Sequence, residues 1–157
     1  MPRRLSPTNR AEWLNLDRQL CFALYSASLA MTKLYKPLLE PLGLTYPQYL
    51  VLLVLWEGDG LTVSQVGERL SLDSGTLTPL LKRLEGAGLV QRLRDTVDER
   101  RVLLRLTAAG RTLKRRALSV PEAVVCASGC ALDELASLTA RLQALREQIS
   151  RSNPDAA

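Results

Sequence analysis

The stretch from Leu61 to Gly110 constrains the fold more than any other part of the chain. Its patterns follow in the order short helix, turn, second helix and two β-prone runs around a charged tip. That order is typical of a winged helix-turn-helix, a module that binds DNA. We therefore expect a mainly α-helical fold with a small β-wing, and a DNA-binding function.

Capping signals set the helix boundaries inside this stretch. Thr62 and Gln65 have capping-box spacing, so one helix should begin just after Thr62. Residues 71–75 favour a turn and a new N-cap. In the second helix, leucines at helical spacing mark the inner face: Leu77, Leu80, Leu81 and Leu84.

The outer face of the second helix supplies candidate contacts to the major groove. These residues are Thr76, Thr78, Lys82 and Arg83. Asp73 and Ser74, at the start of the helix, can cap it and contact the DNA backbone. The β-prone runs 89–90 and 102–106 flank the charged residues 94–101, as the strands of a wing flank its tip.

The distribution of charge agrees with DNA binding. Residues 82–116 hold eleven Lys or Arg and four Asp or Glu, a net charge of +7, whereas the rest of the chain has a net charge of −2. Positive charge clustered on one module is what phosphate binding requires. A solvated basic face on any soluble domain would give the same count, so the charge supports the prediction only together with the helix-turn-helix pattern.

Composition argues against several other classes of protein. The chain has 157 residues, 46% of them hydrophobic, which suits one folded domain over 1–157. No apolar run approaches the roughly 18 residues of a membrane span, so we expect a cytoplasmic protein without membrane contact. Three cysteines do not suggest a disulfide framework, and the lack of histidine removes His-based zinc sites and His-based general bases. We expect neither a metal nor a cofactor, and no enzyme activity.

Further helices should surround the DNA-binding module, which we place at 61–107. A first helix is expected from about Leu16 to Lys36, with Pro37 kinking or ending it. A second, very apolar helix should run from the cap at residues 45–48 through Trp56, a fifth should start after Thr107, and a sixth should cover about 132–149. Pro121 and Gly129 suggest a mobile link between the last two.

The terminal helices carry apolar stripes that a small DNA-binding module could not cover. The stripe near the C-terminus consists of Leu132, Leu135, Leu138, Leu142, Leu145 and Ile149. The stripe near the N-terminus consists of Leu20, Leu24, Leu34 and Leu38, with alanines between them. We expect residues 10–40 and 108–150 to form a homodimer, which twofold DNA sites require. The alternative is that the stripes pack within their own domain.

Several segments of the chain resemble those of one family of regulators. Asp98-Glu99-Arg100, followed by residues 104–110, resembles the DxR…LTxxG pattern of the MarR family of winged-helix repressors. Along nearly its full length the chain is most similar to the organic-hydroperoxide-sensing branch, the OhrR type, and to its two-cysteine members. The segments that carry this closer resemblance are 19–25, 35–39, 45–50 and 72–82.

The resemblance implies a thiol-based sensor. Cys21 corresponds to the peroxidatic cysteine of that branch, and Cys126 to a resolving cysteine contributed by the partner subunit. Tyr35 and Tyr46 correspond to tyrosines that hydrogen-bond the sensing thiol from the other subunit, and Tyr25 to a third tyrosine nearby. In the wing, the resemblance implies that Arg100 enters the minor groove and that Asp98 braces it.

The chemistry of a cysteine thiol is compatible with peroxide sensing by Cys21. A thiolate attacks a peroxide, and the resulting sulfenic acid condenses with a second thiol to give a reversible disulfide. Tyr25 lies four residues from Cys21 on the same helical face, and the apolar surroundings suit an organic hydroperoxide. Cys21 could instead be a small core residue. Cys130 could substitute for Cys126 or be inert.

We therefore expect a homodimeric repressor that binds palindromic double-stranded operator DNA when reduced and is released when an organic hydroperoxide oxidises Cys21. Two alternatives remain open. One is a MarR-type regulator that senses a small aromatic ligand with passive cysteines. The other is a thiol peroxidase, which would leave the DNA-binding module unexplained.

Overall fold

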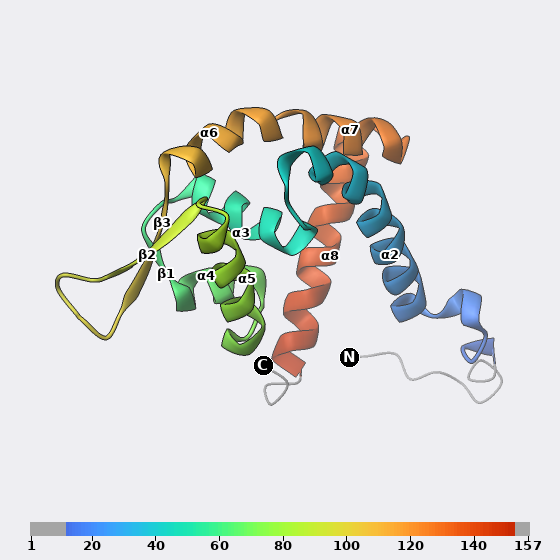
Figure 1. Cartoon of the computed structure of the whole chain (residues 1–157). Coiled ribbons are helices and arrows are strands. Elements are labelled where there is room, and N and C mark those ends of the chain that lie inside the picture. Colours follow the sequence, from blue (N-terminus) through green and yellow to red (C-terminus); the bar gives the residue numbers. More distant parts are fainter. Residues whose placement is uncertain (1–11, 153–157) are drawn as a thin grey trace. The chain divides into compact units, whose positions relative to one another are not determined.

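The computed structural model describes residues 12–152, and the chain divides into two compact units, the second of which begins at Leu118 (Figure 1). The first unit contains η1 (Leu16–Arg18), α2 (Leu20–Leu39), η2 (Glu40–Leu42), α3 (Tyr46–Glu57), β1 (Leu61–Thr62), α4 (Val63–Leu70), α5 (Ser74–Gly86), β2 (Val90–Arg94), β3 (Val102–Leu106) and α6 (Ala108–Ala117). The second contains α7 (Ser119–Ser128) and α8 (Leu132–Ser152). The predicted class, mainly α-helical with a small β-wing, is confirmed.

Helix α3 is the centre of the first unit. Its apolar residues surround the whole helix, which is the pattern of a helix buried on all sides. Val51, Leu52 and Leu55 are at most 1% exposed. The capping box predicted at its start is present: Gln48 Oε1 accepts from the Thr45 backbone N–H at 2.8 Å.

Helices α4 and α5 form the helix-turn-helix. Thr62 caps α4, with its hydroxyl oxygen accepting from the Gln65 N–H at 3.2 Å and the Gln65 side chain accepting from the Thr62 N–H at 2.8 Å. Ser71 turns the chain in the left-handed conformation at φ 54°. Inner-face leucines of α5 are buried as predicted, with Leu77, Leu81 and Leu84 at most 1% exposed and Leu80 half-buried.

The wing belongs to a three-stranded antiparallel sheet in the order β1-β3-β2. Val90 pairs with Leu106 at the base of the β2–β3 hairpin, and Arg94 pairs with Val102 at its far end. The predicted tip began at Arg94, but this residue belongs to β2. The prediction of two strands was also incomplete, because Leu61 and Thr62 form β1 beside β3. A two-residue strand leaves no alternating pattern that a sequence could reveal.

The N-terminal helix differs at both ends from its predicted bounds. A short 3-10 turn, η1, precedes α2, and α2 continues past Pro37 to Leu39. Proline fixes φ near the helical value and removes only one N–H donor, so it can be accommodated near the end of a helix. Pro37 was expected to kink or end the helix, and the second of these alternatives was wrong.

The predicted link containing Cys126 is a helix. Pro121 lies in the first turn of α7, where a missing N–H breaks no helical hydrogen bond. Gly129, at φ 65°, caps the C-terminus of α7. Both residues are helix-boundary signals that the sequence interpretation took for a loop.

Helix α6 is fastened to α3 and to the base of the hairpin. The Trp56 indole Nε1–H donates to the Gly110 carbonyl at 3.0 Å, and the Gly110 N–H donates to the Thr107 hydroxyl at 3.0 Å. A Cβ at position 110 would lie 2.1 Å from the Leu89 carbonyl oxygen. Only glycine permits this approach of α6 to the hairpin.

Among residues 12–152, no single helix is both long and apolar enough to cross a membrane.

Candidate functional site

The N-terminus of α5 is built around Asp73. Its carboxylate accepts from the Thr76 backbone N–H at 2.8 Å and from the Thr76 hydroxyl at 2.9 Å. The backbone hydrogen bond, followed by the hydroxyl bond, lowers the pKa of Asp73. Asp73 is thus an ionised N-cap at neutral pH, as predicted.

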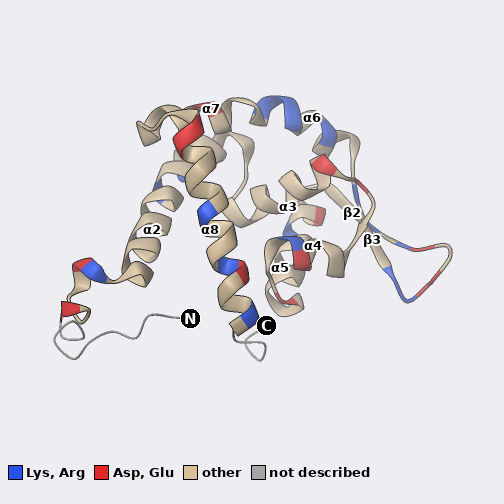
Figure 2. Ribbon diagram, turned by 180° about the vertical axis from the view of Figure 1, so that it is seen from behind, with Lys and Arg blue, Asp and Glu red and all other residues tan. Residues whose placement is uncertain are grey.

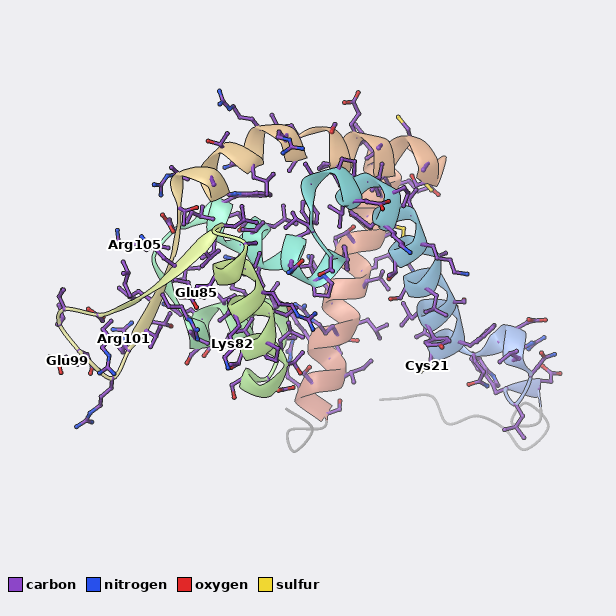
Figure 3. All side chains as sticks on the ribbon, in the orientation of Figure 1. Cys21, Lys82, Glu85, Glu99, Arg101 and Arg105 are labelled. Carbon is purple, nitrogen blue, oxygen red and sulfur yellow. The ribbon has the colours of Figure 1, made fainter. Side chains whose placement is uncertain are left out.

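The predicted major-groove residues share the open side of α5. Thr76, Lys82 and Arg83 are exposed, and Thr78 is half-buried (Lys82 is labelled in Figure 3). Both threonine hydroxyls donate within the helix, because Thr78 Oγ1 donates to the Ser74 carbonyl at 2.7 Å and Thr76 donates to Asp73. Each threonine hydroxyl keeps an oxygen that can still accept a hydrogen bond, whereas Lys82 and Arg83 offer N–H donors.

The tip of the wing, residues 95–101, is held by its own hydrogen bonds. Asp95 and Arg101 close it through a backbone bond of 2.9 Å and an ion pair of 3.8 Å. The Asp98 carboxylate accepts from the backbone N–H of Arg100 at 3.1 Å. Asp98 therefore supports Arg100 through the main chain rather than through the guanidinium.

The charge of Arg100 is available at this tip. Arg100 is exposed, and its guanidinium makes no hydrogen bond or ion pair with any residue in 12–152. Arg101, by contrast, is paired with Asp95. Of the two neighbouring arginines, Arg100 is the one that can reach DNA without breaking an existing contact.

Part of the basic charge of residues 82–116 serves the fold. Figure 2 shows this charge on the hairpin and on α6. Side chains of Arg111, Lys114 and Arg116 donate to the backbone carbonyls of Leu106, Trp56 and Pro41, at 2.7, 2.9 and 2.7 Å. These three cations tie α6 to its neighbours, so the charge count overstates what phosphate can use.

Cys21 is exposed in the first turn of α2 (Figure 3). The N-cap residue, Gln19, makes no capping hydrogen bond with its side chain. Tyr25 lies one turn further along the same face and is 62% exposed. The surrounding surface is apolar, with Leu20, Phe22 and Leu24 also exposed. A small apolar oxidant can therefore reach the thiol on this face of the described chain.

Tyr35 and Tyr46 form a separate cluster, between the end of α2 and the start of α3. Their ring centroids are 4.6 Å apart, and Tyr35 also lies 6.0 Å from Tyr49, which lies 6.2 Å from Trp56. Burial, followed by the neighbouring Tyr46 and Tyr49, raises the pKa of Tyr35, and burial also raises the pKa of Tyr46. Both phenols consequently remain protonated hydrogen-bond donors at neutral pH.

The two tyrosines cannot reach Cys21 of their own chain. Cys21 and Tyr35 are fourteen residues apart on one continuous helix. At a rise of 1.5 Å per residue this separation is about 21 Å. Any contact between these tyrosines and a Cys21 thiol must therefore involve a second copy of the chain.

The two C-terminal cysteines differ in their surroundings. Cys126 is exposed on α7, whereas Cys130 is half-buried just after it. The Cys130 thiol donates to the Ser128 carbonyl at 3.5 Å, and its N–H donates to the Ser128 hydroxyl at 3.3 Å. Cys126 is the more accessible of the two.

Comparison with known proteins identifies the family. A family model described as transcriptional regulator SarA/Rot matches residues 33–117. The organic hydroperoxide resistance transcriptional regulator of Bacillus subtilis is 48% identical, over 92% of this chain and 99% of that protein. The HTH-type transcriptional regulator TtmR of Methylorubrum extorquens is 51% identical, over 92% of this chain and 74% of TtmR.

The chain belongs to the MarR family of winged-helix transcriptional regulators.

Solved structures agree with this assignment. AbfR is a protein of Staphylococcus epidermidis. The structure of reduced AbfR bound to DNA matches this chain with a TM-score of 0.73 and 37% sequence identity, over 89% of this chain and 97% of AbfR. The disulfide form of AbfR has a TM-score of 0.62 and 38% identity, covering 89% of this chain and 98% of AbfR. The Bacillus subtilis relative confirms the resemblance seen in the sequence to the organic hydroperoxide regulators, whereas membership of the two-cysteine branch stays a prediction.

The sequence interpretation of this MarR-family chain missed one residue that holds its DNA-binding elements together. Asp59 accepts from the Leu106 N–H at 2.8 Å and lies 3.5 Å from the Arg111 guanidinium. It connects the end of α3 to the last residue of β3 and to α6. In the sequence Asp59 stands between two glycines, which indicated only a turn.

Proposed function

We propose that the chain is a redox-sensing transcriptional repressor that binds palindromic operator DNA as a reduced homodimer and is released when an organic hydroperoxide oxidises Cys21. The observation that carries this proposal is the exposed Cys21 on an apolar face of a winged-helix chain 48% identical to an organic hydroperoxide resistance regulator. Because its relatives are transcriptional regulators, we take the chain to be a regulator rather than an enzyme, and we expect it in the cytoplasm.

DNA binding divides between two elements. The open side of α5, with Thr76, Thr78, Lys82 and Arg83, would enter the major groove while Asp73 and Ser74 lie at the backbone. Arg100 would enter an adjacent minor groove, where a narrow groove attracts a guanidinium. The free guanidinium of Arg100 and the exposed position of Lys82 support this division.

The homodimer is supported by exposed apolar surface on the terminal helices. On α2, Leu20, Leu24 and Leu29 are exposed, and on α8 Leu132, Leu138 and Ile149 are exposed. Leu20 and Leu24 lie one turn apart on the same face of α2, and exposed apolar surface of this kind supports an interaction site. A second copy would also bring Tyr35 and Tyr46 within reach of Cys21, which one chain cannot do because of the length of α2.

The sensing reaction balances with residues of the chain and the inducer alone. The Cys21 thiolate attacks the hydroperoxide, so that an S–O bond forms and the O–O bond breaks. The hydroxyl stays on sulfur as a sulfenic acid, and the alkoxide leaves and takes up a proton to become an alcohol. Tyr25, Tyr35 and Tyr46 would donate hydrogen bonds at the thiolate. The Cys126 thiol of a partner chain then attacks the sulfenic sulfur, giving a disulfide and water. Its exposure on α7 favours Cys126 over Cys130 for this step.

The test uses the full-length reduced protein and a palindromic duplex that it selects from a random DNA library. We expect cumene hydroperoxide to release the duplex, dithiothreitol to restore binding, and mass analysis without reductant to find disulfides that join Cys21 of one chain to Cys126 of the other, two per fully oxidised homodimer. Full DNA occupancy with Cys21 completely oxidised would refute the proposal. Release by a small aromatic acid, with all cysteines reduced, would favour the ligand-sensing alternative, and steady peroxide consumption without DNA binding would favour a thiol peroxidase.

A further inference from the structure

An ion pair joins α5 directly to the wing. Arg92 on β2 donates to Glu85 Oε2 from Nε at 3.0 Å and from Nη2 at 2.6 Å. Both side chains are about two-thirds enclosed, at 32% and 38% exposure. The hydrogen bond from Arg92 lowers the pKa of Glu85, so the carboxylate is charged at neutral pH. Figure 3 shows Glu85 on α5 beside the hairpin.

The pair lies where the apolar anchoring of the hairpin ends. Along β2, Val90, Arg92 and Arg94 share one face of the sheet, because side chains alternate along a strand. Val90 is 1% exposed at the base, Arg92 is half-buried and Arg94 is exposed. In the described chain, the hydrogen bonds and ion pairs of the tip residues 95–101 all stay within the tip. The Glu85–Arg92 pair is therefore the outermost ionic contact between the hairpin and α5.

We infer that Glu85 and Arg92 are positioning residues for DNA binding. Their pair fixes the angle between the wing and α5, so that Arg100 and the outer face of α5 meet their two grooves together. This inference rests on the proposed DNA-binding function. Arg92 uses both donors on one carboxylate oxygen, so its planar guanidinium constrains direction as well as distance.

Two other roles for the pair predict different results. If Arg92 itself binds phosphate, Glu85 competes for it, and removing Glu85 should strengthen DNA binding. If the pair only stabilises the fold, the folded fraction of a variant should bind DNA like the wild type. Simple electrostatics also predicts stronger binding when a negative charge is removed near DNA. The positioning role alone predicts weaker binding from the loss of Glu85.

The test compares Glu85→Ala with a matched control, Glu57→Ala. Glu57 is also in the last turn of its helix and also pairs with an arginine, Arg69, but that pair joins α3 to α4 and leaves the wing untouched. Each variant loses one negative charge, and alanine keeps the helix propensity high. Affinity for the selected palindromic duplex is measured across a salt titration, below the melting transition of each protein.

We expect Glu85→Ala to weaken binding about tenfold and to lower the salt dependence, within the range of coupling between contacting residues. In an Arg100→Ala background the same change should have little further effect, because the wing no longer contributes. Arg92→Lys, which keeps the charge and loses the fork of donors, should reproduce the defect. Glu57→Ala should bind like the wild type.

Unchanged or stronger binding by Glu85→Ala overturns the inference, and so does a defect that adds fully to that of Arg100→Ala or that Glu57→Ala shares. Failure of the wild type to bind any duplex would instead contradict the proposed function. If Glu85→Ala does not fold, Arg92→Lys decides by the same comparisons.

Discussion

The Asp98 carboxylate lies 3.1 Å from the backbone nitrogen of Arg100 and leaves the arginine guanidinium uncovered at the tip of the wing. The main chain is therefore fixed at the residue that we propose enters DNA, while the charge of its side chain remains available. The neighbouring Arg101 differs, because its guanidinium is not free but pairs with Asp95 and helps close the tip.

Arg100→Ala should weaken operator binding and lower the slope of log affinity against log salt by about one per wing, if phosphate charge is its main partner. Oxidation of Cys21 should be unaffected, because the wing and the thiol lie on different elements. Filter binding across a salt titration measures the first effect and sulfenic acid trapping the second. Wild-type affinity at every salt concentration would remove the wing from the binding model.

Asp98→Asn and Asp98→Ala should behave differently. An asparagine side chain retains the oxygen that accepts from the Arg100 N–H, so Asp98→Asn should bind DNA nearly as well as the wild type. Asp98→Ala loses the acceptor and should show a defect smaller than that of Arg100→Ala. Equal defects in the two Asp98 variants would mean that the negative charge, rather than the turn, is what matters.

Cys21→Ser should bind operator DNA like the wild type and fail to release it with an organic hydroperoxide. Serine replaces sulfur with oxygen at nearly constant size, so the exposed first turn of α2 should be unchanged. Gel-shift titrations with increasing cumene hydroperoxide measure the response. Cys130→Ser is the control and should respond normally. Release of Cys21→Ser at wild-type concentrations would place the sensor elsewhere.

Cys126→Ser should abolish the covalent dimer that oxidised wild-type protein forms on a non-reducing gel. The Cys21 sulfenic acid would then persist and react with dimedone, adding one label per chain. An intact covalent dimer in this variant would assign the resolving role to Cys130. A disulfide within one chain of the wild type would contradict the intersubunit arrangement.

Gly110→Ala should destabilise the fold strongly, whereas Gly86→Ala should not. An alanine Cβ at position 110 meets the Leu89 carbonyl at 2.1 Å, while nothing lies within 4 Å of a Cβ at position 86. Overpacking at buried sites lowers the free energy of unfolding by about 1–3 kcal/mol or more. Thermal unfolding followed by circular dichroism compares the two variants. Equal melting temperatures would show that α6 can move away from the hairpin without loss.

The elements best predicted from the sequence were those with local chemical signals. The capping pairs at Thr45 and Thr62 located the starts of α3 and α4, and the leucine spacing of α5 identified its buried face. Local signals failed where the structure depends on distant partners. Strand β1 exists because β3 lies beside it, and Asp59 reaches Leu106 across 47 positions of sequence.

The candidate site was predicted unevenly for a similar reason. Residue type and spacing indicated Lys82, and the family resemblance indicated Cys21 and Arg100, but the pairing of Glu85 with Arg92 requires the hairpin to fold back along α5. Pro121 and Gly129 suggested a loop because the same residues that interrupt a helix also mark its ends. How Tyr35 and Tyr46 contribute depends on a second chain, which no pattern within one sequence describes.

The aromatic cluster gives the molecule an optical property. The chain has two tryptophans, and Trp56 lies at one end of the series Tyr46, Tyr35, Tyr49 and Trp56, each ring within 6.2 Å of the next. Excitation energy absorbed by these tyrosines can be transferred to the Trp56 indole. The indole N–H donates a hydrogen bond to the Gly110 carbonyl on α6. With Trp13 replaced by phenylalanine, all tryptophan emission would come from this one position, so an unlabelled chain reports on the junction of α3 and α6.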